Sequence, residues 1–430
     1  MKVDIISLGC SKNLVDSESL MAQLQASGIE VHHDPVRPRG DVVVVNTCGF
    51  IGDAKEESID TILQLADAKK RGKIKKLLVM GCLSERYAKD LREALPEVDK
   101  FYGKFHWKDI VSDLGLGLRK DLLTERSLTT PKHYAYLKIS EGCNRFCSYC
   151  AIPIITGRYV SRTIEDILDE AKKLRDKGVR ELQVIAQDLS MYGEDIYKSG
   201  KLAELTQRLS DIDGIDWIRL HYAYPAGFPK DLLPVMASNP KVCRYLDIAL
   251  QHISDNMLVK MRRRITKQET FNLLDEIRAS VPGIHLRTTL ITGHPGETEE
   301  DFEELKDFVV KYRFERLGVF PYSHEEQTYA YKNYIDDVAD EVKSMRAEDI
   351  MRIQADISRG INENKVGTTI PIMVDRREGD HYVARSEFDS PEVDPEVIIN
   401  VKEGQKVKVG TLTNVKIVGA DDYDLFAELV

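Results

Sequence analysis

The sequence has no run of about 18 consecutive apolar residues, the length that a membrane-spanning helix requires, so we expect no membrane association. Its first residues, MKVDIISLGCSKN, lack the basic stretch and long apolar core of a secretory signal peptide, and we expect a cytoplasmic protein. The net charge of −10 argues against a protein held on nucleic acid by a broad basic field. Hydrophobic residues, at 42%, are frequent enough to build cores, which excludes global disorder.

Cysteine is scarce, with seven in 430 residues, an odd number and too few for a disulfide framework on this length. In a reducing compartment, cysteines at meaningful spacing are more often metal ligands or catalytic groups.

Nucleotide-binding glycine motifs are missing as well. No G-x-G-x-x-G follows the first strand-like run, and GHPGE at 293–297 lacks the Lys-Ser/Thr of a P-loop. We interpret 293–297 as a loop near the active site.

Residues 1–120 alternate strand-like runs at 3–8, 41–46 and 76–80 with helical stretches at 17–27 and 53–70. This rhythm predicts an α/β domain with a parallel sheet and helices on its faces. Residues 121–133 are polar, contain Ser, Thr and Pro, and are interpreted as a linker.

Residues 134–363 repeat a strand–helix unit six times and then end in a charged amphipathic helix within 331–363. Six units are too few for a closed eight-fold barrel and indicate an open, partial (β/α)6 barrel. The expected strands are 134–140, 181–187, 217–222, 245–250, 285–291 and 316–320. The expected helices between them are 163–177, 201–209, 267–280 and 299–312.

Residues 364–430 change in character to short β-like runs separated by turns that contain Gly or Asp. This pattern predicts a small antiparallel β-barrel. The expected strands are 369–374, 381–384, 406–409 and 414–418.

Three cysteines, Cys143, Cys147 and Cys150, form the motif CNRFCSYC directly after the first strand of the central domain. Three thiolates on one loop can hold three corners of a cubane iron–sulfur cluster and leave the fourth iron open for a ligand. The alternative is a zinc site that takes a fourth ligand from elsewhere, although the spacing differs from the usual zinc pattern.

Cys10, Cys48 and Cys82 are far apart in the sequence, but each lies just past the C-terminal end of an expected parallel strand. Such strand ends share one edge of a sheet, so the three thiols are expected to converge and hold a second cluster. The alternative is three small buried core residues. Cys243 has no partner at ligand spacing and is assigned to packing. Glycine, which permits close approach of a bulky ligand, adjoins each of the three: Gly9, Gly49 and Gly81.

A CxxxCxxC motif on the first loop of a partial barrel resembles the signature of the radical S-adenosylmethionine enzymes. Together with the N-terminal cysteine domain and the C-terminal barrel, the whole chain is similar to their methylthiotransferase family. The resemblance implies a flavodoxin-like cluster domain, a radical barrel and an OB-like TRAM domain. It also implies two [4Fe–4S] clusters and S-adenosylmethionine, which serves as methyl donor and radical source. Tyr149 occupies the position of the family pattern just before the third cysteine.

Several stretches are similar to the RimO branch of this family, which modifies an aspartate of small-subunit ribosomal protein uS12. The resemblance implies insertion of sulfur and a methyl group at the aspartate β-carbon, with an electron donor, a sulfur source and uS12, free or in the ribosomal subunit, as partners. Ser11 and His294 depart from the pattern, at positions where proline and an aromatic are usual. The matching stretches are LGCSKNLVDSE, GCNRFCSYCAIPIITGRYVSR, HYAYP at 221–225, LDIALQHISDNMLVKMRRR and RSEFDSPEVD at 385–394.

A tRNA adenosine methylthiotransferase is the main alternative. Residues 365–430 carry 8 Lys and Arg against 13 Asp and Glu, a net charge of −5, which suits a basic ribosomal protein better than RNA. An acidic surface kept for solubility would look the same. The basic run MRRRITK at 261–267 is expected to be a solvated helix end, but it leaves RNA contact open. A non-enzymatic cluster carrier is more remote, because it needs no six-unit barrel.

The cofactor is expected at the C-terminal ends of the barrel strands. No catalytic residue is expected beyond the cluster ligands, and ordinary core or rim positions are the alternative for each cofactor candidate. The candidates are Tyr149 before the third cysteine of the motif, Gln187 and Asp188 after the second strand, Gln251 and His252 after the fourth, Arg287 on the fifth, and Val319 and Phe320 on the sixth, beside the adenine.

Overall fold

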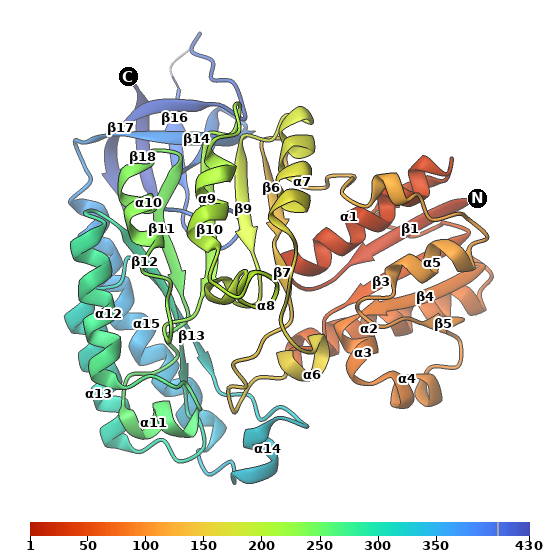
Figure 1. Cartoon of the computed structure of the whole chain (residues 1–430), viewed down its shortest axis with the longest axis horizontal. Helices are drawn as coiled ribbons and strands as arrows, with labels where there is room; N and C mark the ends of the chain where they lie inside the picture. Colours follow the sequence, from red (N-terminus) through yellow and green to blue (C-terminus); the bar gives the residue numbers. More distant parts are fainter. Residues whose placement is uncertain (402–403) are drawn as a thin grey trace.

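The computed structural model of the chain describes residues 1–401 and 404–430 (Figure 1). Its first part is a five-stranded parallel sheet in the order β2-β1-β3-β4-β5, with α1 and α5 on one face and α2 on the other. The alternating side chains of β3 enter both layers, which explains why its four consecutive valines are all buried. The strands are β1 (Lys2–Ser7), β2 (Glu30–His33), β3 (Val42–Thr47), β4 (Lys76–Gly81) and β5 (Lys100–Phe101). The helices are α1 (Ser11–Ala26), α2 (Gly52–Lys70), α3 (Cys82–Arg86), α4 (Ala88–Ala94) and α5 (Trp107–Asp113).

Helix α1 begins six residues earlier than the helix expected over 17–27. Its first turns contain the buried polar residues Lys12, Asn13 and Asp16, which lie outside the helix expected from the sequence. Asn13 is buried by contacts within the first part. Lys12 and Asp16 are buried because this end of α1 packs against the second part, where Lys12 lies over Tyr222 and Asp16 pairs with Lys138.

The second part confirms the expected six-stranded open barrel, with all strands parallel in the order β13-β12-β11-β10-β9-β6. The strands are β6 (Tyr134–Lys138), β9 (Glu181–Ile185), β10 (Trp217–Ala223), β11 (Val242–Ile248), β12 (His285–Thr292) and β13 (Arg316–Pro321). The main outer helices are α7 (Ile164–Asp176), α9 (Leu202–Ser210), α10 (Leu232–Ser238), α12 (Lys267–Ser280), α13 (Glu299–Tyr312) and α15 (Asp340–Glu363).

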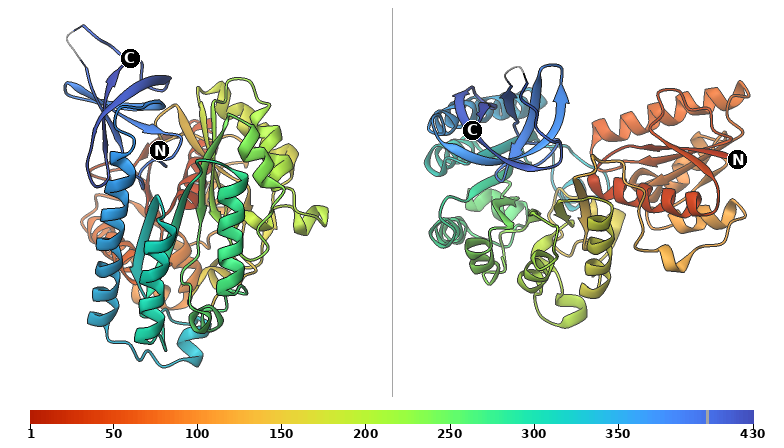
Figure 2. Two further views of the ribbon diagram at one scale, coloured as in Figure 1. Left: turned by 90° about the vertical axis from the view of Figure 1, so that its left-hand side faces the viewer. Right: turned by 90° about the horizontal axis from the view of Figure 1, so that it is seen from above.

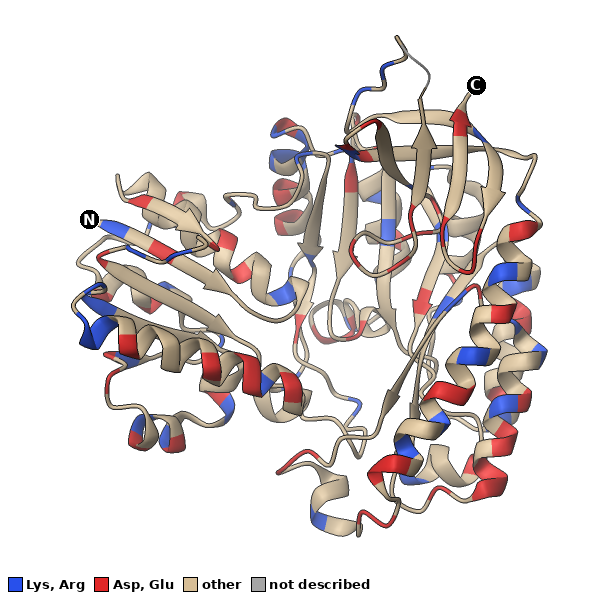
Figure 3. Cartoon of the chain, turned by 180° about the vertical axis from the view of Figure 1, so that it is seen from behind, with Lys and Arg blue, Asp and Glu red and all other residues tan. Residues whose placement is uncertain are grey.

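The open side of this barrel, next to β6, faces the first part of the chain, and α15 packs back on β13 as expected (Figures 1 and 2). Acidic and basic residues are interspersed along the outer helices (Figure 3). No helix among the described residues is both long and apolar enough to cross a membrane. The short elements are η1 (Lys120–Leu122), β7 (Ser140–Glu141), α6 (Ile152–Thr156), β8 (Val160–Ser161), η2 (Leu189–Met191), α8 (Glu194–Tyr197), α11 (Asp255–Lys260) and α14 (Tyr329–Asn333).

The third part is a closed five-stranded barrel in the order β14-β15-β16-β18-β17. Two details of the sequence expectation were wrong. Residues 406–409 alternate like a strand but lie mostly exposed in a loop, and β16 pairs with β18 in parallel, so the barrel is not wholly antiparallel. The strands are β14 (Thr369–Glu378), β15 (His381–Ser386), β16 (Val397–Asn400), β17 (Leu412–Ala420) and β18 (Leu425–Leu429).

The third part is joined to the second by a buried network of charges. Arg385 on β15 lies 2.8 Å from Glu181 on β9 and 2.6 Å from Asp375 on β14. Glu181 also pairs with Arg219 at 3.0 Å, and all of these side chains except Asp375 are at most 2% exposed. Because buried charges need counter-charges, this network fixes how the small barrel sits on the large one.

We expect Arg385→Met to lower the free energy of unfolding by about 3 kcal/mol, the lower end of the range for breaking a buried ion pair, because Glu181 keeps Arg219. Arg376→Met is the matched control. Arg376 pairs with Glu378 and Glu396 in solvent, so its loss should cost at most about 1 kcal/mol. Denaturant unfolding measures both. Equal effects of the two substitutions would contradict a structural role for the buried network.

The same network predicts a pH dependence. Burial alone would raise the pKa of Glu181, but the Arg385 and Arg219 guanidiniums lower it from 4.5 to about 2. A carboxyl whose folded pKa is lowered stabilises the protein above its unfolded pKa and loses that contribution as the pH falls through the folded pKa. The stability difference between the wild-type protein and Glu181→Gln should therefore shrink as the pH falls from 4.5 to about 2. Acid titrations followed by circular dichroism test this, and a constant difference would contradict it.

Candidate active site

Cys143, Cys147 and Cys150 lie together on the loop between β7 and α6, at the C-terminal end of β6. Cys143 and Cys147 are buried and Cys150 is half-buried. Burial is the main reason that the pKa of Cys143 rises to about 11, and the neighbouring Cys147 sulfur adds to this rise. The pKa of Cys150 is raised by burial and then by Cys147 and Cys143. The fold thus gathers three soft donors in one place, as the sequence predicted.

Hydrogen bonds fix the backbone of this loop from several sides. Ser148 donates its N–H to the carbonyl of Met261 at 3.0 Å, and its own carbonyl accepts from the N–H of Ala330 at 2.7 Å. The Ser148 hydroxyl lies 3.0 Å from Nε2 of His294. This contact gives a physical reason for the histidine at a position where the family usually has an aromatic.

The basic run at 261–267 was expected to be a solvated helix end, and this expectation was wrong for Arg263. Its side chain is buried, with Nη1 3.3 Å from Cys147 Sγ and 3.2 Å from Tyr149 Oη. The guanidinium also stacks 4.1 Å from the ring centroid of Tyr224. Sequence reasoning missed this residue because three consecutive arginines resemble a solvated helix end. Its two neighbours, Arg262 and Arg264, are indeed exposed.

The cofactor candidates of the second strand line the same end of the barrel, where they already have protein partners. Gln187 donates to Glu141 Oε2 at 2.8 Å, and its own amide oxygen is buried without a hydrogen bond. Asp188 is paired with Arg145 at 2.6 Å. These contacts place both residues near the cysteine loop, and their contact with the cofactor stays a prediction.

The other candidates are more dispersed. Gln251 has a positive φ of 73° and bridges β12 through its backbone, and Phe320 is 55% exposed. Arg287 lies 3.2 Å from Asp247 and 3.3 Å from Asp394, so the carboxylates it binds here belong to the protein. His252 is fully buried, with Nε2 3.5 Å from Glu297, and Val319 packs against the barrel core.

Cys10, Cys48 and Cys82 lie near one another at the strand ends of the first part, and their role as cluster ligands stays a prediction. A Cβ added to Gly9 would lie 3.3 Å from Cys48 Sγ, and the sulfurs of Cys10 and Cys48 both raise the pKa of Cys82, which burial brings to about 12. Desolvation also raises the pKa of Cys10, but the nearby Lys12 and Lys104 charges reverse the shift, so its pKa is lowered.

The sequence suggested that the glycines beside these cysteines allow a bulky ligand to approach. In the structure, Gly49 and Gly81 instead allow chain segments to approach each other. A Cβ on Gly49 would lie 2.6 Å from the backbone of Leu83, and one on Gly81 would lie 2.5 Å from Asn46 Oδ1. The glycines thus allow the chain segments themselves to pack closely, and this packing brings Cys48 beside Cys82. Gly81, at φ 105°, also adopts a backbone conformation that favours glycine.

The two cysteine groups lie on facing elements. Cys82 forms a buried apolar cluster with Ala151 and Ile155, and Ala151 directly follows Cys150. Helix α3 therefore contacts α6 across the junction (Figure 1). The junction is tied further by Glu325, which accepts from Arg86 at 2.9 Å and from Lys55 at 2.8 Å.

The donor sets fit iron–sulfur clusters, because thiolates are the ligands that such clusters use. Within residues 1–401 and 404–430, no three His, Cys, Asp or Glu side chains converge closely enough to hold a single metal ion. Three thiolates spread over one loop, or over three strand ends, suit a cluster with several irons.

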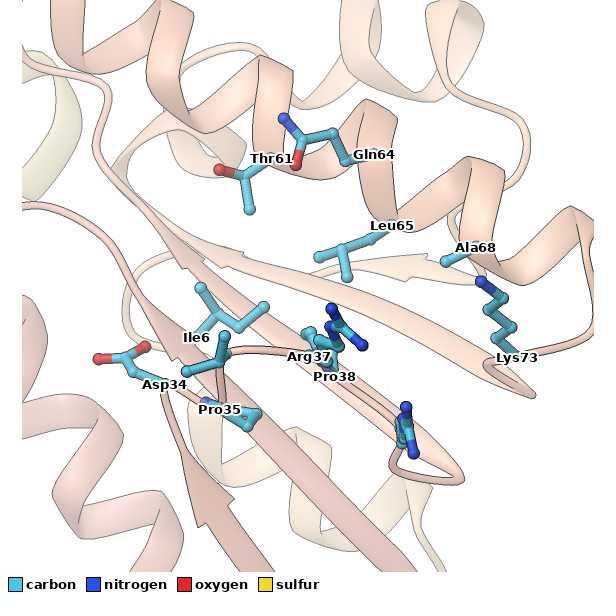
Figure 4. A pocket seen from close by; sticks show the side chains of 12 residues that line it. Ile6, Asp34, Pro35, Arg37, Pro38, Thr61, Gln64, Leu65, Ala68 and Lys73 are labelled. Atoms are coloured by element: carbon cyan, nitrogen blue, oxygen red, sulfur yellow. The ribbon is translucent and has the colours of Figure 1, made fainter.

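A separate hollow of about 800 Å³ lies between α2 and the loop after β2 (Figure 4). Arg37, Arg39 and Lys73 line it together with the apolar side chains of Ile6 and Leu65. None of the six cysteines is among its lining residues, so it is not part of this candidate site.

Comparison with known families matches three models along the chain. The Radical SAM superfamily covers residues 137–309, the TRAM domain covers 366–430, and the uncharacterized protein family UPF0004 covers 2–103. Among solved structures, the radical S-adenosylmethionine methyltransferase TsrM from Kitasatospora setae, with tryptophan and a cofactor analogue bound, is similar in fold. Its TM-score is 0.54 at 15% identity, over 88% of this chain and 79% of that chain.

Curated relatives match over the whole length. "Ribosomal protein uS12 methylthiotransferase RimO" from Phocaeicola vulgatus is 58% identical over 428 residues, which cover 100% of this chain and 99% of the relative. The protein of the same name from Flavobacterium psychrophilum is 53% identical over 99% of this chain and 98% of its own length. This level of identity, over chains of the same length and with the same three parts, shows that the chain belongs to the RimO family of radical S-adenosylmethionine methylthiotransferases.

Proposed function

We propose that this protein inserts sulfur and a methyl group at the β-carbon of an aspartate in ribosomal protein uS12. The observation that carries the proposal is the packing of Cys82 against Ala151, which places one group of three cysteines beside the other. A reaction that must both activate a carbon and deliver sulfur to it needs two such groups close together. The full-length relatives that carry the uS12 name support the same substrate.

In this proposal each cysteine group holds one [4Fe–4S] cluster. Cys143, Cys147 and Cys150 would hold the cluster that binds S-adenosylmethionine, and Cys10, Cys48 and Cys82 would hold the second. When bound, the cofactor and clusters supply a radical that can remove an unactivated hydrogen, together with the sulfur and methyl group to be added. An electron donor and a sulfur source complete the reaction, which we place in the cytoplasm.

The residues of the chain contribute position and electrostatics. Arg263 donates to Cys147 Sγ, and a hydrogen bond to a ligand sulfur is one of the means by which proteins adjust a cluster's potential. Lys138 lies 2.5 Å from Asp16, and Asp16 lies 3.5 Å from Lys104, so charges of both signs close the junction between β6 and α1.

Ribosomal protein uS12 is favoured over tRNA by the charge of the C-terminal barrel. Its net charge of −5 over residues 365–430 complements a basic protein, whereas tRNA binding relies on Lys and Arg contacts to phosphate. The relatives named above also carry the name of the protein substrate.

The test is a reaction of anaerobically reconstituted protein with S-adenosylmethionine and reductant, offered uS12 and unmodified tRNA in separate samples. Mass spectrometry should find one methylthio group in place of hydrogen on an aspartate peptide of uS12. A methylthio group on a tRNA adenosine, with uS12 unchanged, would overturn the substrate.

A further inference from the structure

Lys12 is a buried cation at the junction between the first two parts of the chain. It is the second residue of α1, two positions after Cys10, and only 8% of it is exposed. Its Nζ lies 3.3 Å from the ring centroid of Tyr222, at the end of β10. Within the described part of the chain, Lys12 has no carboxylate partner and donates no hydrogen bond through its side chain.

The other buried and half-buried cations around the two cysteine groups have partners within the protein. Except for Arg263, which donates to the Cys147 sulfur and the Tyr149 hydroxyl, these cations pair with carboxylates. They are Lys104 and Lys138 with Asp16, Arg145 with Asp188, Arg287 with Asp247, and Arg263 with the Cys147 sulfur. Burial of a charge is costly without a counter-charge, and the ring of Tyr222 supplies only part of one. Lys12 is therefore the cation at this junction for which the described residues supply neither a carboxylate nor a side-chain hydrogen bond.

Tyr222 gives a second, independent sign of a ligand site. It has a φ of 67°, a conformation that is strained for a non-glycine residue and that clusters at functional sites. It is held in place by a hydrogen bond from its N–H to Asp247 Oδ2 at 3.3 Å, while 36% of the residue remains exposed. The unpaired ammonium of Lys12 thus lies over a partly exposed ring whose residue has a strained backbone.

The same short segment reaches the other cysteine group. Tyr224, two residues after Tyr222, has its hydroxyl 3.8 Å from Cys147 Sγ. The segment 221–225 thus contacts Lys12, beside Cys10, with one tyrosine and Cys147 with the next. A carbon that reacts between the two cysteine groups must lie close to this segment.

We propose that the Lys12 ammonium, over the ring of Tyr222, binds the side-chain carboxylate of the aspartate that is modified. The proposal rests on the function proposed above, in which the β-carbon of that aspartate lies between the cysteine groups. The carboxylate carbon is bonded directly to the β-carbon, so a cation that holds the carboxylate also positions the reacting carbon. Because Lys12 lies beside Cys10 rather than beside the Cys143 loop, we assign it to the substrate and not to the carboxylate of S-adenosylmethionine.

The test compares the affinity of the reconstituted protein for two forms of uS12, one with the target aspartate and one with asparagine in its place. We expect the wild-type protein to prefer aspartate and Lys12→Met to bind the aspartate form about 30-fold or more weakly, as for loss of one partner of a buried charge pair. Lys12→Met should bind the asparagine form as the wild-type protein does. Lys12→Arg should retain the preference for aspartate, because it keeps the charge.

Lys89→Met, at an exposed lysine of α4, is the control for the change in net charge and should bind like the wild-type protein. Iron and sulfide content show whether each variant assembles its clusters, and the affinity for S-adenosylmethionine is measured alongside. Equal weakening of both uS12 forms by Lys12→Met, unchanged binding of both, or weakened cofactor binding alone would overturn the proposal. Failure of the wild-type protein to modify uS12 would instead overturn the proposed function, and the assignment of Lys12 with it.

Discussion

Replacing Cys147 with alanine is expected to abolish reductive cleavage of S-adenosylmethionine, with a loss of more than about 100-fold. Loss of a residue that only supports a metal ligand typically costs 10–100-fold, and loss of a ligand should cost more. The cluster of the N-terminal group should still assemble, because Cys10, Cys48 and Cys82 come from other strands of another sheet. Anaerobic cleavage assays and iron counts per chain measure the two effects.

Cys243→Ala is the matched control for Cys147→Ala. Cys243 is also a buried cysteine, but it packs against Trp217, Tyr245 and Met373, away from both groups. This variant should keep both clusters and cleave the cofactor as the wild-type protein does. Undiminished cleavage by Cys147→Ala would contradict the assignment of the CxxxCxxC loop.

Cys48→Ala is expected to differ from Cys147→Ala, because it should lose product formation and keep cofactor cleavage. Cofactor cleavage should continue within about twofold of wild type, while methylthiolated uS12 should fall by more than about 100-fold, again because a ligand is lost. The separation is expected because Cys48 belongs to the group on the first sheet, whereas the Cys143 loop is held by contacts of the second part, such as those of Ser148.

The measurement for Cys48→Ala is a pair of yields from one reaction, cleaved cofactor and methylthiolated peptide. The Cys243→Ala protein serves again as the control. Normal product from Cys48→Ala would show that the second group does not deliver the sulfur. Loss of both yields would show that the two groups do not act separately.

The fold and the cysteine groups could be predicted because their signals are local and periodic. Short apolar runs alternating with helical stretches dictate parallel sheets, and the ends of parallel strands meet at one edge. This placed Cys10, Cys48 and Cys82 together without any knowledge of tertiary contacts. The expected helix at 53–70 and the strand at 76–80 agree with α2 and β4 to within a residue.

The residues that were missed depend on contacts between distant parts of the chain. Arg263 and Lys12 look solvated in sequence, since each is a basic residue in a polar stretch. They are buried because the start of α1 packs against the second part, where Lys12 meets Tyr222, and because the 261–264 turn folds over the cysteine loop. The parallel pairing of β16 with β18 likewise follows from closure of the barrel, which local patterning does not encode.

The most direct test of the account uses uS12 that carries deuterium at the β-carbon of the target aspartate. If the aspartate is held between the two cysteine groups and its β-hydrogen is removed by the cofactor-derived radical, deuterium should appear in the 5′-deoxyadenosine that is released. The methylthio group should appear at the same carbon. Methylthiolated uS12 that forms with no deuterium in the 5′-deoxyadenosine would contradict the account.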